Sequence, residues 1–171
     1  MANTTFSGPV ISKNGFTTTG PGTTVSLTAD TTLTVKSHAG RILLCNDADG
    51  VFTLPTINVN ANGKTSGETD YNNLNNIGAS FYFYVETLAT AIKITTDGTD
   101  KFKGAAMVAV DDGNKKAFIP GATNDAIDLN GTTKGGLVGS VIQVTAIDTN
   151  SYLVHNTLLL GSGTIVTPFG N

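Results

Sequence analysis

The segment Ala79-Ser80-Phe81-Tyr82-Phe83-Tyr84-Val85-Glu86 alternates between two sets of large side chains. A period of two places successive side chains on opposite faces of a β-strand, so we expect a strand here. One face, carrying Phe81, Phe83 and Val85, would belong to the core. The other face would carry Tyr82 and Tyr84, whose rings have an apolar body and a polar tip. Such rings suit a second packed layer or a subunit interface better than open solvent.

Short segments of the same kind recur along the chain, separated by turn residues such as Asp, Asn, Gly and Pro. They cover residues 25–27, 33–35, 41–46, 51–54, 91–96, 102–110, 115–119, 126–129, 141–147 and 151–154. We expect two hairpins, one around Asp47-Ala48-Asp49-Gly50 and one around Asp148-Thr149-Asn150. About ten short strands without a helix of ordinary length predict a single all-β domain, either a sandwich or a barrel. No internal repeat of fixed period is visible.

Composition supports this fold class and narrows the partners. Charged residues make up 13% of the 171 residues, Trp is absent and Gly is frequent. The net charge of -3, without clustered Lys and Arg, argues against a nucleic-acid partner. Cys45 is the single cysteine, so no intramolecular disulfide can form and we expect a buried, inert thiol. The sequence shows no signal peptide, and no segment approaches the ~18 apolar residues of a membrane helix.

Residues 1–22 differ from the rest. The run Thr5-Phe6-Ser7-Gly8-Pro9-Val10-Ile11-Ser12-Lys13-Asn14-Gly15-Phe16 is apolar but broken by Gly8-Pro9 and Asn14-Gly15, so it fits neither helical nor strand periodicity. A hinge of small residues follows in Thr17-Thr18-Thr19-Gly20-Pro21-Gly22. We therefore expect an extended N-terminal arm and hinge at 1–22 and a β-rich body at 23–171. The arm would bury its large side chains against its own body, a neighbouring subunit or another protein.

A second irregular segment covers residues 58–76, which are rich in Asn, Gly, Ser and Thr. A loop of this length is uncommon inside a compact domain. It is either a solvated insertion or a segment that carries contacts.

Sequence motifs for catalysis are missing, and we expect neither an enzyme nor a cofactor. His38 and His155 have no metal-binding spacing, so we expect no metal site. There is no Gly-x-Ser-x-Gly motif for a serine nucleophile. The two glutamates, Glu68 and Glu86, and the turn aspartates do not indicate the acid pair of a glycosidase. Asp47-Ala48-Asp49-Gly50 departs from a calcium-binding loop, because its Gly comes two positions early and Asn58 replaces the bidentate Glu.

Several short motifs resemble small virion structural proteins of tailed bacteriophages, particularly phages of marine bacteria and cyanobacteria. The arm 5–16 carries part of the resemblance, as does Ala39-Gly40-Arg41 leading to Thr53-Leu54-Pro55. The rest lies in Asn130-Gly131-Thr132-Thr133-Lys134-Gly135-Gly136-Leu137, Tyr152-Leu153-Val154 and Gly161-Ser162-Gly163-Thr164-Ile165-Val166-Thr167-Pro168-Phe169.

This resemblance implies a capsid decoration (cement) protein, assembled in the host cytoplasm as a β-rich homotrimer on the outside of the head. Its partner would be the major capsid protein, with no nucleic-acid or membrane partner. The predicted arm contacts are Phe6, Pro9, Val10, Ile11 and Phe16, and the tail residues Pro168 and Phe169 form a second candidate anchor. For both anchors, packing on the chain's own core is the alternative. A tail or head fibre protein that binds host surface glycans is the alternative function, although it would favour a longer shaft-like repeat or an exposed aromatic platform.

Overall fold

The computed structural model describes residues 23–59, 75–111 and 113–171. The first six strands are β1 (Thr24–Leu27), β2 (Thr31–Thr32), β3 (Ile42–Cys45), β4 (Val51–Thr53), β5 (Ser80–Val85) and β6 (Ile92–Thr95). The remaining strands are β7 (Lys101–Gly104), β8 (Ala106–Val110), β9 (Lys115–Phe118), β10 (Ala126–Leu129), β11 (Val141–Asp148), β12 (Ser151–Gly161) and β13 (Phe169–Gly170). The helix of the described residues is the four-residue α1 (Val35–His38). The all-β prediction is confirmed.

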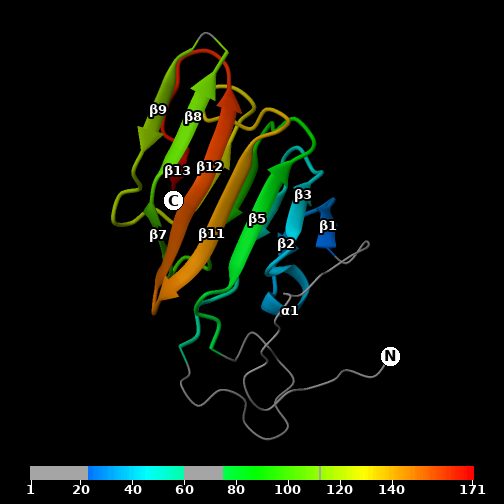
Figure 1. Cartoon of the computed structure of the whole chain (residues 1–171), viewed down its shortest axis with the longest axis vertical. Coiled ribbons are helices and arrows are strands. Elements are labelled where there is room, and N and C mark those ends of the chain that lie inside the picture. Colours follow the sequence, from blue (N-terminus) through cyan, green and yellow to red (C-terminus); the bar gives the residue numbers. More distant parts are fainter. Residues whose placement is uncertain (1–22, 60–74, 112) are drawn as a thin grey trace, which may run out of the picture.

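The strands form two mixed sheets that enclose one core, so the fold is a sandwich (Figure 1). The large sheet has the order β1-β3-β5-β11-β12-β8-β9, and β7 also pairs with β12. The small sheet has the order β13-β10-β6-β4-β2. The two sheets meet through side chains such as Phe52 of β4 and Phe83 of β5, whose rings stack with centroids 6.4 Å apart.

Strands β1 to β6 alternate between the two sheets in chain order. β1, β3 and β5 run parallel in the large sheet, while β2, β4 and β6 run parallel in the small sheet. The chain therefore winds through successive two-strand coils, each stacked on the one before, as in a β-solenoid. Thr24 pairs with Ile42, and Ile42 with Tyr82, so the second coil is more than twice as long as the first. This inequality explains why the sequence shows no fixed period.

The coils build the core because their inward side chains stack in register. In the small sheet the ladder runs from Thr31 of β2 to Phe169 of β13 through Phe52, Ile94 and Ile127. In the large sheet a ladder joins Val25, Leu43, Phe83 and Ile142. The inward residues expected from β5 are buried as predicted: Phe81, Phe83 and Val85.

The hairpin predicted around Asp47-Ala48-Asp49-Gly50 is wrong, because β3 and β4 belong to different sheets. The turn residues form a corner between the sheets instead. The carbonyl of Ala48 accepts hydrogen bonds from the backbone N–H groups of Thr90 and Ala91, at 2.7 and 3.0 Å, in the next coil. Gly50 leaves room for a core ring, since a Cβ there would lie 2.8 Å from Cζ of Phe52.

The strand predicted at residues 33–35 is also wrong. β2 ends at Thr32, Leu33 is buried, and α1 begins at Val35. Thr34 caps the helix, and its hydroxyl accepts a hydrogen bond of 3.3 Å from the N–H of Ser37. Such a cap stabilises the first turn of a helix, which the apparent alternation of Leu33 and Val35 concealed.

The hairpin predicted around Asp148-Thr149-Asn150 is confirmed as β11 and β12, which pair antiparallel. Gly104 divides the strand predicted at residues 102–110 into β7 and β8, and both run parallel to β12. Gly104 has φ of 96°, and a Cβ there would lie too close to the carbonyl oxygen of Val154. β12 extends to Gly161, well beyond the predicted end at residue 154.

Most of the loop predicted at residues 58–76 lies outside the described residues, but its two ends meet. The N–H of Asn76 donates to the carbonyl of Asn58 at 2.9 Å, and the N–H of Asn58 donates to Oδ1 of Asn76 at 2.8 Å. Nδ2 of Asn76 donates to the carbonyl of Thr56 at 2.9 Å. Asn76 is 4% exposed. The chain therefore leaves the coil and rejoins it at the same point.

Candidate interaction surface

Tyr82 and Tyr84 lie half-buried on the outer face of the large sheet, opposite the core. Figure 1 looks onto this sheet, whose strands run from β9 to β1 across the view. Ile42 of β3 pairs with Tyr82, and Leu44 of β3 pairs with Tyr84. The alternation within β5 places both tyrosines on this face, but their neighbours are set by the register of distant strands.

One row of outward side chains across this sheet is almost entirely apolar. Strand pairing joins Leu44 to Tyr84, Tyr84 to Val141, and Val141 to Leu158. The parallel register of Leu159 with Val108 puts Leu158 beside Met107, and Met107 pairs with Ala117. We call these six residues the apolar row: Leu44, Tyr84, Val141, Leu158, Met107 and Ala117. Leu158 and Met107 are 40% and 43% exposed, so their side chains face outward.

A bulge in β12 decides which leucine joins this row. Gln143 pairs with His155 and Val141 pairs with Leu158, so Asn156 and Thr157 together face Ile142. Asn156 has φ of 45°, the left-handed conformation that Asn tolerates better than most residues. The extra residue reverses the phase of the strand. Leu158 therefore points outward, while Leu159 is buried.

The outer face beside the apolar row is polar, and its side chains bond to one another. Ser80 Oγ accepts hydrogen bonds from Nε2 of Gln143 at 2.8 Å and from Oγ1 of Thr145 at 3.0 Å. Thr145 also lies 2.9 Å from Nε2 of His155. Nδ2 of Asn156 donates to Oε1 of Gln143 at 2.8 Å. These groups have partners within one chain and depend less on water.

Charged side chains are kept away from the centre of this face. The outward positions of β1, β3 and β5 are Thr24, Ser26, Ile42, Leu44, Ser80, Tyr82 and Tyr84. Those of β11 and β12, apart from the hairpin end at Asp148, are Val141, Gln143, Thr145, Ile147, Leu153, His155, Asn156, Thr157, Leu158 and Leu160. None of these is Asp, Glu, Lys or Arg. Interface cores are depleted of charge and enriched in Tyr and Met, so this face has the composition of a protein contact surface.

The other predicted contact residues have different positions. Pro168 is buried, and Phe169 is 6% exposed and pairs with Ile127 as the last member of the small sheet's ladder. Both therefore occupy the chain's own core, which is the alternative given for them above, and neither belongs to the candidate surface. The arm residues Phe6, Pro9, Val10, Ile11 and Phe16 lie outside the described residues, and their role stays a prediction.

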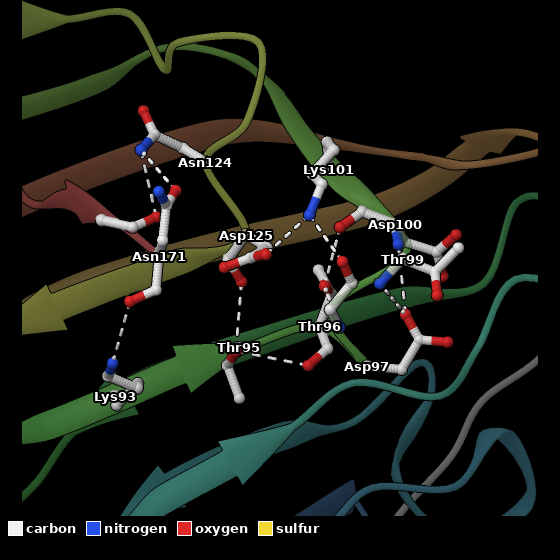
Figure 2. Close-up of polar contacts among 12 residues, drawn as sticks. Lys93, Thr95, Thr96, Asp97, Thr99, Asp100, Lys101, Asn124, Asp125 and Asn171 are labelled. Carbon is white, nitrogen blue, oxygen red and sulfur yellow. Dashed lines mark hydrogen bonds and ion pairs between the residues drawn. The ribbon is translucent and has the colours of Figure 1, made fainter.

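The densest polar cluster lies at the turn between β6 and β7 and has a structural role (Figure 2). Lys101 Nζ donates to Oδ2 of Asp125 and to the carbonyl of Gly98, both at 2.6 Å. Oδ1 of Asp97 accepts the N–H groups of Thr99 and Asp100 at 2.9 and 3.1 Å. These contacts close the turn and hold it to the segment before β10.

Asp100 is the buried carboxylate of this cluster, with 2% of its surface exposed. It accepts a hydrogen bond of 2.8 Å from the N–H of Ile57. Burial raises its pKa, and the neighbouring carboxylates of Asp97 and Asp148 add to the effect. Asp97 has its pKa lowered: burial acts in the opposite direction, but hydrogen bonds from Thr56 and from backbone N–H groups outweigh it. Both carboxylates accept hydrogen bonds from backbone N–H groups and so hold the turn in place.

Other reactive side chains are accounted for by the fold. Cys45 is fully buried, and burial raises the pKa of its thiol to about 12, so it is inert. Burial lowers the pKa of His38, whose Nδ1 accepts a hydrogen bond of 2.9 Å from the N–H of Thr34. Across residues 23–59, 75–111 and 113–171, no three His, Cys, Asp or Glu side chains gather in a way that could hold a metal ion. The same residues contain no helix long and apolar enough to cross a membrane.

Comparison of the chain with protein-family models, with curated proteins and with solved structures gives no significant match.

Proposed function

We propose that this protein is a structural component of a tailed bacteriophage that decorates and stabilises the outside of the capsid. The body would contact other copies of the chain, in a homotrimer, and the N-terminal arm would contact the major capsid protein. The protein would be made in the host cytoplasm and end in the virion. No catalytic step, cofactor, nucleic acid or membrane is part of this function.

The observation that carries the proposal is the outer face of the large sheet, where the outward positions of β1, β3, β5, β11 and β12 are uncharged apart from the hairpin end at Asp148. Solvent-facing sheet surfaces usually carry many charged groups, and this one carries an apolar row flanked by internally bonded polar side chains. A surface of this kind fits permanent contact with protein better than turnover of a substrate.

The sequence of the arm supports the second part of the proposal. The first described strand, β1, lies at one edge of the large sheet. Each added contact of an oligomer on a regular shell is intramolecular and gains from effective concentration. Weak contacts by several arms would then suffice for stable attachment.

Truncation of residues 1–22 tests the role of the arm. The truncated chain should keep the thermal unfolding of the full chain but lose most of its occupancy on capsids that lack the protein, measured by quantitative gel analysis of pelleted particles. A matched variant, Phe6→Ser with Phe16→Ser, should reduce occupancy without shortening the chain. Undiminished binding by a well-folded truncation would contradict the proposal.

The alternative function, a tail or head fibre protein that binds host glycans, is favoured by one observation. The parallel coils of β1 to β6 have the winding of solenoids, which stack into elongated shafts. The small sheet also carries a hollow of about 260 Å³, lined by the charged side chains of Lys93, Asp128 and Lys134 and by apolar residues such as Leu129. The described residues contain three such coils, which is short for a shaft. Binding of the chain to host cells without a capsid would favour this alternative.

A further inference from the structure

We infer that the outer face of the large sheet is where copies of this chain meet one another, with the apolar row beside the symmetry axis. This inference rests on the proposed function and names the partner of the contact surface. The partner is a second copy of the chain, not the capsid shell.

Charge is the first reason to choose a second copy. Each chain carries a net charge of -3, so two copies repel unless they meet through uncharged surface. The outward positions of β1, β3, β5, β11 and β12 provide such a surface, with the hairpin end at Asp148 excepted. Lys103 of β7 pairs with Leu153 and forms an ion pair of 3.3 Å with Asp148 at the hairpin end, whereas Lys115 and Lys116 lie on the edge strand β9, where they discourage pairing of the sheet edge. The outward positions of these five strands, away from the hairpin end, therefore offer no charged group to a partner recognised by its opposite charge.

Size is the second reason. Seven strands spaced about 4.8 Å apart, with β5 six residues long, give a face of roughly 34 by 20 Å, or about 680 Å². The relief of the side chains makes the accessible area larger than this flat projection. A stable interface buries about 800 Å² on each partner. The face is therefore close to the size that a stable contact between two copies needs.

The cost of removing this face from water is low, which is the third reason. Burying a polar group costs free energy unless the group keeps a hydrogen-bond partner. The polar side chains beside the apolar row, Ser80, Gln143, Thr145, His155 and Asn156, bond to one another within one chain. They can be covered by a second copy without losing those bonds.

The residues at the middle of the apolar row define the test. Val141 and Leu158 pair with each other at its centre, and Leu158 is 40% exposed, so a substitution there leaves the core intact. Leu88 is a matched control, because it is similarly exposed, at 49%, and lies in the loop between β5 and β6.

Light scattering after size-exclusion chromatography is the first measurement. The full chain should elute with a mass two or three times its 17.6 kDa, and Leu158→Glu should reduce the mass to that of one chain. Leu88→Glu should keep the mass of the full chain. The inference is overturned by a monomeric full chain, by an oligomer that survives Leu158→Glu, or by equal dissociation in both variants.

Disulfide cross-linking gives a second readout that does not depend on weakening the contact. Cys45 is fully buried and does not react, so a cysteine introduced at the surface is the reactive thiol of the described residues. Under mild oxidation, Val141→Cys or Leu158→Cys should give a covalent dimer at protein concentrations where Leu88→Cys does not. If neither central cysteine cross-links better than Leu88→Cys, the inference is wrong.

Binding to capsids separates this inference from the proposed function. A full chain that is monomeric in solution and still decorates capsids would overturn the inference and leave the function standing. A full chain that forms the oligomer through this face but does not bind capsids would support the inference and contradict the function.

Discussion

Asp97 and Asp100 lie three residues apart in the turn between β6 and β7, and their pKa values move in opposite directions from the ordinary 3.8. Burial, with repulsion from Asp97 and Asp148, raises the pKa of Asp100. The folded state then holds this proton to a higher pH than the unfolded chain does. Ionisation of Asp100 therefore lowers the stability of the folded state as the pH rises above about 4. Asp97 behaves in the opposite way. Its carboxylate stabilises the folded state above about pH 4, and this stabilisation is lost as the pH falls below that value.

This opposition predicts opposite effects of two similar substitutions. Asp100→Asn keeps an oxygen for the N–H of Ile57 and removes a buried charge, so it should raise the denaturation midpoint near pH 7. Asp97→Asn weakens hydrogen bonds to a charged acceptor and should lower the stability near pH 7 by about 1 kcal/mol. The difference for Asp100→Asn should shrink as the pH falls toward about 4, whereas the difference for Asp97→Asn should persist to a lower pH, because the folded state keeps the Asp97 carboxyl ionised there. Urea unfolding at several pH values measures them, and a loss of stability near pH 7 in both variants would contradict this account.

The sequence predicted single residues well where local alternation decides their position. Phe81, Phe83 and Val85 are buried because a strand of period two has no other way to place them. Alternation could not predict which of Leu158 and Leu159 faces outward, because the bulge at Asn156 and Thr157 reverses it. The signal in the sequence is weak, because an Asn within a strand-like segment does not by itself identify a bulge.

At the scale of elements, antiparallel and parallel pairings differ in how visible they are in the sequence. The hairpin of β11 and β12 is joined by a short turn, which the residues Thr149 and Asn150 mark. Parallel partners such as β1 and β3 are joined through a strand of the other sheet and have no turn signature of their own. The error at Asp47-Ala48-Asp49-Gly50 has this cause, because a turn signal shows where the chain bends and not which sheet it enters.

If the coils fold as described, residues 60–74 should be dispensable for folding of the body. Asn58 and Asn76 already hold the two ends together, so the chain can be joined from Val59 to Asn75 by two glycines. Shortening a loop roughly fourfold lowers its closure entropy, so stability should be unchanged or rise by ~1 kcal/mol. Thermal unfolding followed by circular dichroism measures the change.

A control in the shortened chain tests whether the hydrogen bonds of Asn76 hold the two ends of the loop together. Asn76→Ala leaves the N–H of Asn58 and the carbonyl of Thr56 without their present partner, and should cost about 1–3 kcal/mol. Loss of cooperative unfolding in the shortened chain with Asn76 intact would contradict the coil description.

At the scale of the whole molecule, the candidate surface was only partly predictable. The pattern of β5 identified Tyr82 and Tyr84 as residues of a second face. Their neighbours Leu44, Val141 and Leu158 come from strands far apart in the sequence, and only the register of the sheet brings them together. Pro168 and Phe169 had the same apolar character in the sequence, but both are buried, and Phe169 pairs with Ile127 as part of β13. Apolar character alone did not separate core from surface.

The proposed function makes the number of copies in each particle its most direct test. A decoration protein occupies repeated positions over the capsid, so its abundance follows that of the shell subunit, whereas a fibre occupies one or a few positions. Quantitative mass spectrometry of purified virions, with labelled peptides of this chain and of the major capsid protein as standards, measures this ratio. We predict a copy number comparable with that of the major capsid protein. A handful of copies in each virion, or none, would contradict the account.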